Sequence, residues 1–284
     1  MPRERMARIV GLALRVGVYV FLAFVGLYLF GWALSPTGSF LLEAALGGFL
    51  AATAANALAM RFFERAHLTG IGLGWNRASV RNLLLGLAGG AGAAALVLGG
   101  PLVCGLARLQ PAPGADPHLR SFLFVLVVLL FGAIGEEMLF RGYAFQSLVA
   151  GVGPAATILP MGVLFGLMHA ANLGITTIGI VNTSLWGILL GYAFVRSGDL
   201  WLPIGLHLGW NWMLPAFGVN LSGFTMDVTG YAIHWKIGPL WSGGAYGPEG
   251  GLLTSGVVVV LAVYLWKAPV RTQAAYLLGG AGED

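Results

Sequence analysis

Charged residues and cysteine are scarce in this chain. Aspartate, glutamate, lysine and arginine make up 9% of the 284 residues, whereas soluble domains carry about 25%. So little charge cannot cover a water-facing surface, which excludes an ordinary soluble protein. The one cysteine, Cys104, cannot form an intrachain disulfide, so cysteine content does not identify the redox compartment.

Lysine is almost absent, with two lysines beside thirteen arginines. The formal net charge is +4, but nearly all basic residues stand at the ends of apolar runs. This is the pattern of membrane topology, so no nucleic-acid partner is expected. The arginine bias and the 45 glycines indicate a prokaryotic genome, and therefore a multi-pass protein of a prokaryotic inner membrane.

Long apolar runs are what the chain has instead. Hydrophobic residues make up 58% of it, and a membrane span needs about 20 of them in succession. Eight runs qualify as candidate spans: 10–34, 40–60, 82–107, 121–149, 155–171, 176–195, 200–217 and 252–267. We predict an all-α, polytopic transmembrane bundle of about eight helices, in which 1–284 form one domain embedded in the lipid bilayer.

The basic residues predict how this bundle lies in the membrane. The first run is long and lacks a small-residue cleavage site, so we expect a retained span. Placing both termini in the cytoplasm leaves only Arg108, Arg120 and Lys236 on the outer side, as the positive-inside rule requires. The connection 61–81 is then cytoplasmic, and 218–251 is external.

Among the polar residues inside the predicted spans, six need an explanation, because an ionisable group there costs about 2.5–3.5 kcal/mol even on insertion scales. They are Glu136, Glu137, Arg141, His169, His207 and Asn211. Glu137 and Arg141 stand four residues apart and predict an ion pair that braces their helix. Glu136 lies about 100° around that helix and needs a different partner.

Helix lengths suggest where this partner lies. Glu136 and His169 flank the turn at 150–154 at nearly equal distances, so a hairpin would place both about 25 Å from it. His207 and Asn211 share one helical face. Each histidine alone has a structural alternative, a hydrogen bond to a neighbouring carbonyl, and the glutamates alone also suit an ion path. A carboxylate, two imidazoles and an amide together point to chemistry.

Three motifs carry a family resemblance. They are Glu136-Glu137-Met138-Leu139-Phe140-Arg141, Phe165-Gly166-Leu167-Met168-His169 and His207-Leu208-Gly209-Trp210-Asn211. Together they resemble the signature of the CAAX-protease and bacteriocin-processing family, relatives of the prenyl-protein endoprotease of the eukaryotic endoplasmic reticulum. The similarity covers about residues 120–215, which we expect to form the catalytic core.

The resemblance implies a glutamate-dependent intramembrane peptidase whose cavity opens toward the cytoplasm. Its substrate would be a membrane-anchored protein or peptide, cleaved near its C-terminus, with or without a prenyl group. Glu136 would be the general base, assisted by His169, while His207 and Asn211 would stabilise the oxyanion. Glu137 and Arg141 would support Glu136, and Phe165 would pack or form a cavity wall.

Three other interpretations stay open. Two histidines and a glutamate are a familiar zinc set, although the chain has no His-Glu-x-x-His motif and we expect no cofactor. A proton-coupled transporter would use the same ionisable groups as a relay. An inactive scaffold of the same fold would have no need of all these polar residues.

Overall fold

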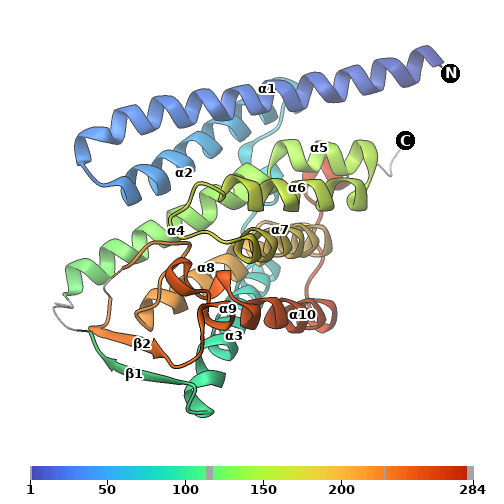
Figure 1. The fold of residues 1–284 in the computed structure, drawn as a ribbon. Coiled ribbons are helices and arrows are strands. Elements are labelled where there is room, and N and C mark those ends of the chain that lie inside the picture. The colour runs from blue at the N-terminus through green and yellow to red at the C-terminus, as the bar shows by residue number, and fades with distance from the viewer. Residues whose placement is uncertain (1, 113–117, 227, 280–284) are drawn as a thin grey trace.

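The structure, a computed structural model, describes residues 2–112, 118–226 and 228–279. It is a bundle of helices, which confirms the predicted fold class (Figure 1). The long elements are α1 (Pro2–Leu34), α2 (Phe40–Ala59), α3 (Arg77–Val103), α4 (Leu119–Arg141), α5 (Tyr143–Val152), α6 (Pro154–Met168), α7 (Thr177–Ser197), α8 (Trp201–Ala216) and α10 (Leu252–Lys267). Shorter elements are α9 (Pro239–Ser242), α11 (Tyr276–Gly279), β1 (Ala107–Pro111) and β2 (Tyr231–Trp235).

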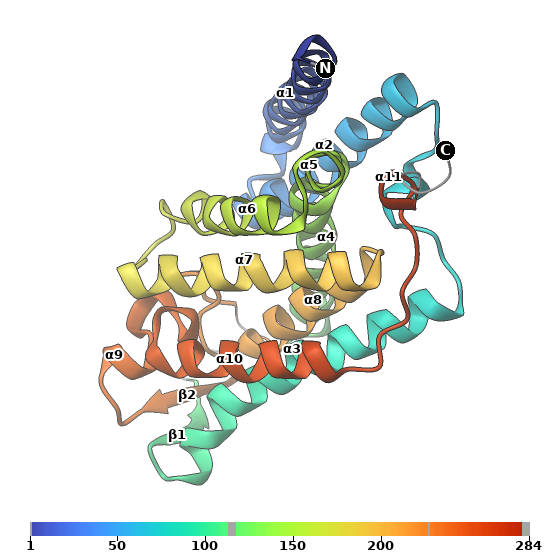
Figure 2. The same ribbon diagram turned by 90° about the vertical axis from the view of Figure 1, so that its right-hand side faces the viewer.

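In the described part of the chain, five helical segments are long and apolar enough to cross a membrane, so the chain is an integral membrane protein. These segments are Arg3–Thr37, Phe40–Glu64, Arg77–Val103, Leu119–Val152 and Thr177–Ser197. The remaining predicted spans correspond to α6, α8 and α10, which have 15, 16 and 16 residues. A span of about 20 residues is usual, so these three are short for a bilayer. Figure 2 shows α6, α7 and α10 lying side by side.

The connections gather at two opposite ends of the bundle. At the first, which we call the N-terminal end, Leu200 donates to the Gly72 carbonyl and Gln273 to the Ser197 carbonyl. The first turns of α1 lie toward this side in Figure 1. At the second, the hairpin end, β1 pairs with β2, and Phe40 stacks on Phe224 with ring centroids 5.7 Å apart.

The strand pair at the hairpin end was not predicted. The third run was expected to continue as helix to residue 107, but α3 ends at Val103. Pro101 occupies its last turn, and Gly105 then takes a left-handed backbone conformation, with φ +70°, that reverses the chain. The following residues pair antiparallel with Tyr231–Trp235. A five-residue strand beside a long apolar run gives too little pattern to be recognised.

The predicted run 121–149 is two helices, because the helix breaks at Gly142. The side chain of Asn56, from α2, bridges the break: its amide donates to the Met138 carbonyl and its oxygen accepts from the Tyr143 N–H, at 3.0 and 2.7 Å. Both backbone groups thereby keep a partner inside the bundle. The straight hairpin used to compare depths is therefore interrupted, because α5 and not α4 precedes α6 across the turn at Gly153.

Glycines bring α3 and α8 into direct backbone contact. The residues involved are Gly86, Gly90, Gly205 and Gly209, from two of the small-xxx-small spacings in the sequence. A Cβ atom on Gly86 would collide with the Leu202 carbonyl oxygen, and one on Gly209 would lie 2.6 Å from that of Leu87. Only glycine allows helices to approach so closely. The helix that carries the third motif is thus fixed against α3 along its back.

Candidate active site

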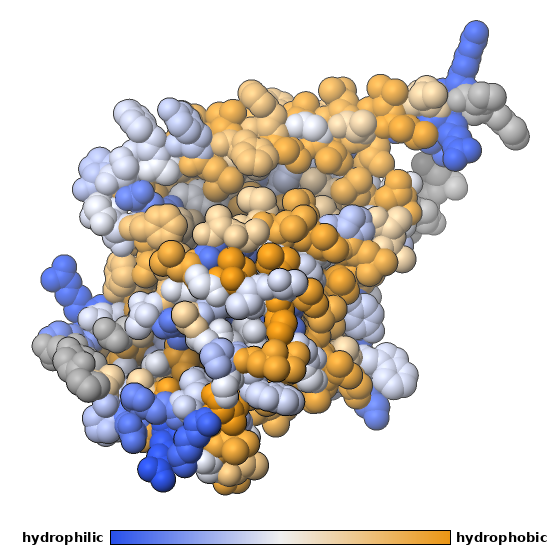
Figure 3. Space-filling view, viewed as in Figure 1, coloured by the Kyte–Doolittle hydropathy of each residue, from blue (hydrophilic) through white to orange (hydrophobic). Residues whose placement is uncertain are grey.

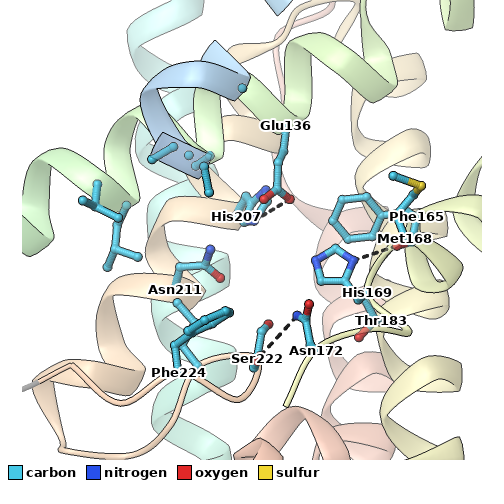
Figure 4. A pocket seen from close by; sticks show the side chains of 18 of the residues that line it. Glu136, Phe165, Met168, His169, Asn172, Thr183, His207, Asn211, Ser222 and Phe224 are labelled. Carbon is cyan, nitrogen blue, oxygen red and sulfur yellow. Dashed lines mark hydrogen bonds and ion pairs between the residues drawn. The ribbon is translucent and has the colours of Figure 1, made fainter. Parts of the chain in front are cut away.

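An apolar cavity of about 370 Å³ lies among α2, α4, α6, α7, α8 and the segment 221–226. Figure 4 shows side chains that line this cavity. Five of the predicted site residues line it: Glu136, Phe165, His169, His207 and Asn211. Three separate segments of the chain thus bring the polar groups of the three motifs around one space.

The two adjacent glutamates have different surroundings. The side chain of Glu136 is 39% exposed and borders the cavity, whereas that of Glu137 is fully buried behind it. Glu137 Oε1 accepts a hydrogen bond from Arg141 Nη1 at 3.1 Å, so the ion pair expected from their spacing is formed. Of the two carboxylates, Glu136 is therefore the one that can meet water and substrate.

The charge of Arg141 is held inside the protein. Its Nη2 donates to the Gly187 carbonyl at 2.8 Å, and its guanidinium lies 4.9 Å from the ring centroid of Phe165. A buried guanidinium has to be compensated in this way by a carboxylate, a carbonyl and an aromatic face. Arg141 therefore fixes α4 against α6 and α7 and is not presented to the cavity.

His207 links the two glutamates, a contact that sequence reasoning missed. Its Nδ1 lies 2.8 Å from Glu137 Oε1, and its Nε2 lies 3.8 Å from Glu136 Oε2. Because an ionised carboxylate only accepts, Nδ1 must carry the hydrogen, and Nε2 then faces Glu136. The buried glutamate thereby sets both the tautomer and the orientation of the ring.

His169 stands on the opposite wall of the cavity, in the first position after α6 (Figure 4). Its Nδ1 lies 2.8 Å from the Phe165 carbonyl oxygen, and its ring packs on that of Phe165 with centroids 4.9 Å apart. A carbonyl oxygen accepts only, so Nδ1 carries the hydrogen and Nε2 keeps a free lone pair. Between the described side chains of Glu136 and His169 there is no hydrogen bond; the assistance of Glu136 by His169 stays a prediction.

Asn211 follows His207 by one helical turn and lines the same wall (Figure 4). The two side chains share a face of α8 because residues four apart on a helix lie one above the other. Together they offer an imidazole nitrogen and a carboxamide to one region of the cavity. The opposite face of α8 carries the glycines that pack on α3.

A second carboxylate in the cavity lining, Glu249, was also missed. It belongs to the connection 218–251, which was predicted to be external and whose role the sequence did not indicate. Its Oε1 accepts from Trp210 Nε1 at 3.3 Å, and its Oε2 accepts from the backbone and hydroxyl of Ser222 at 2.6 and 2.9 Å. Burial raises the pKa of Glu249, while the hydrogen bonds from Ser222 oppose that rise. The only sign of Glu249 in the sequence was its position as an isolated glutamate in an apolar connection, which does not show that it reaches the cavity.

The fold and the cavity together define a class: a helical membrane protein with a carboxylate, two imidazoles and a carboxamide around an apolar internal space. Residues 118–213 match the family model described as type II CAAX prenyl endopeptidase Rce1-like. These residues are thus similar to the CAAX-protease family that the three motifs resemble, and the similarity supports a membrane peptidase. The matched segment contains all seven predicted site residues. A comparison with curated proteins gave no match.

Proposed function

We propose that this protein is a glutamate-dependent intramembrane endopeptidase that cleaves a membrane-anchored protein or peptide. One observation carries the proposal: Glu136 borders the cavity beside His207 Nε2, while Glu137 and Arg141 neutralise each other behind it. Of the ionic groups in this part of α4, only the carboxylate of Glu136 remains for chemistry. Its apolar surroundings strengthen its electrostatic interactions with nearby groups.

Glu136 is the general base in this mechanism. It removes a proton from a water molecule in the cavity, and the hydroxide oxygen bonds to the carbonyl carbon of the scissile peptide. His169 Nε2, with its free lone pair, accepts a hydrogen bond from the same water and orients it. When the C–N bond breaks, the protonated Glu136 returns its proton to the leaving amine nitrogen, which restores the starting carboxylate.

His207 and Asn211 stabilise the negative charge that develops on the carbonyl oxygen. Carboxylates stand near both nitrogens of His207. The ring can therefore carry a proton at Nε2 while its Nδ1–H continues to donate a hydrogen bond to Glu137. Protonated Nε2 and the Asn211 amide then both donate from one face of α8. Donors held in place before the reaction cost no reorganisation during it.

The proposal is tested by comparing the termini of membrane proteins from cells that produce this chain with those from cells that do not. We expect new termini on a small set of membrane-anchored polypeptides. If the two sets of termini are identical and the purified protein conducts protons in liposomes, the protein is a transporter and not a peptidase.

Replacing Asn211 with alanine should lower kcat by about 10²–10³-fold, the usual cost of removing one oxyanion donor, with a smaller change in KM. The measurement is steady-state cleavage of a substrate identified by its new terminus. Asn211→Asp keeps the size of the side chain and loses the N–H donor, so it should be at least as impaired. Near-normal turnover of Asn211→Asp would assign Asn211 to packing instead.

Removal of metal ions should leave activity unchanged. Nδ1 is already hydrogen-bonded in both site histidines, to Glu137 in His207 and to a backbone carbonyl in His169. Among the described residues, no group of three or more His, Cys, Asp or Glu side chains is arranged to hold a metal. The measurement is the cleavage rate after exhaustive chelation; loss of activity that zinc restores would establish the metal-dependent alternative.

A further inference from the structure

The two ends of the bundle differ strongly in basic charge. Ten basic residues lie at the N-terminal end: Arg3, Arg5, Arg8, Arg61, Arg65, Arg77, Arg81, Arg196, Lys267 and Arg271. The described part of the hairpin end has three: Arg108, Arg120 and Lys236. Figure 3 shows hydrophobic residues over the body between these ends, and hydrophilic ones at the tip of α1 and around β1 and β2. By the positive-inside rule, the N-terminal end faces the cytoplasm.

The contacts around Arg15 agree with this assignment. Arg15 lies inside the predicted run 10–34, but its Nη1 lies 2.9 Å from Glu64 Oε1, where the second span ends. Leu12 lies where a side chain on Gly151 would be, next to the turn between α5 and α6. The first turns of α1, with Arg3 and Arg5, therefore extend beyond the ends of the neighbouring helices, as a basic cytoplasmic segment would.

The cavity is closer to the hairpin end. Its walls include Phe40 and Leu41 in the first turn of α2, and the segment 221–226. His169 lies where α6 has ended, in the connection that leads to α7. Asn172 in that connection donates to the Ser222 carbonyl at 3.2 Å. Loops of the hairpin end thus form part of the cavity wall, whereas the connections of the N-terminal end contribute no residue to its described lining.

We infer that the catalytic cavity is served from the non-cytoplasmic side of the membrane, and that its substrates are polypeptide segments next to the outer face of the bilayer. The inference rests on the proposed peptidase function and concerns where that function acts. It opposes the cytoplasmic opening implied by the family resemblance. The aromatic residues Tyr231 and Trp241, both about half exposed at the hairpin end, suit a bilayer interface there.

Cys104 provides a native reporter, because it is exposed where α3 ends, next to β1. Spheroplasts producing the protein are treated with a membrane-impermeant maleimide before and after permeabilisation. Cys104 should react in intact spheroplasts, and so should Thr225→Cys, beside the cavity, in a Cys104→Ser background. The matched control is Thr69→Cys in the same background, at the exposed N-terminal end, which should react only after permeabilisation.

The opposite labelling pattern, or equal labelling of both ends in intact spheroplasts, would overturn the inference. So would failure of both hairpin-end thiols to react even after permeabilisation, because that end would then not reach water. Labelling does not depend on catalysis, so it separates this inference from the proposed function. If both hold, the new termini map to non-cytoplasmic segments; if the protein is no peptidase, no new termini arise whichever side is labelled.

Discussion

Glu136→Gln is expected to lower the cleavage rate by about 10²–10⁴-fold while the protein remains folded, because the amide keeps the shape of the side chain and loses its basicity. Glu136 is 39% exposed, and its carboxylate accepts no hydrogen bond from a described residue, so little structure depends on it. The measurement is cleavage of an identified substrate, with thermal unfolding in detergent as the check on folding.

The matched control is Glu43→Gln. Glu43 stands in the first turn of α2, at the same end of the bundle, and does not belong to the described cavity lining. Glu43 is half-buried, and an amide of the same size outside the cavity lining should leave the cleavage rate within about twofold. If Glu136→Gln cleaves at the normal rate, Glu136 is not the base and the mechanism proposed above is wrong.

Glu137→Gln is expected to act on stability first. Its carboxylate is the partner of both Arg141 and His207, at 3.1 and 2.8 Å, and the first pair is almost completely buried. Removing one charge of a buried pair leaves the other uncompensated, which typically costs about 3–5 kcal/mol. Thermal unfolding in detergent should therefore show a large fall in Tm, and the surviving protein should turn over slowly because His207 loses its orienting acceptor.

A double variant separates the ion pair from the rest. Glu137→Gln combined with Arg141→Met removes both charges, so the guanidinium is no longer buried without a counter-ion. The double variant should be more stable than Glu137→Gln alone, although it should not regain activity. A double variant that is less stable than either single one would show that the two residues stabilise the protein independently.

The spans and the ion pair were predictable because they depend on distances along one helix. Apolar length alone located helices at all eight runs, of which five are long enough to cross a membrane, and a spacing of four residues was enough for Glu137 and Arg141. The contact between Glu137 and His207 was not predictable. It depends on how α8 is rotated against α4, and apolar surfaces on every side of a buried helix leave that rotation without a signal.

The break at Gly142 shows a second limit. Nothing near Gly142 demands an interruption, since glycine is common in membrane helices. The break depends on Asn56, more than 80 residues earlier, whose side-chain oxygen accepts from the Tyr143 N–H in place of a backbone carbonyl. Glu249 was overlooked for a similar reason: only the folded connection carries it back beneath Trp210.

The glycine contact between α3 and α8 has a consequence for how the cavity admits a polypeptide. Two helices whose backbones touch cannot slide or tilt separately without steric clashes between them. Helix α8 is therefore a rigid support for the side chains of His207 and Asn211. On the facing side of the cavity, the ring of Phe40 in α2 stacks on that of Phe224 in the segment 221–226. In the mechanism proposed above, the oxyanion donors would therefore stand on a rigid helix, and the cavity would widen for a polypeptide on the side of α2 and this segment.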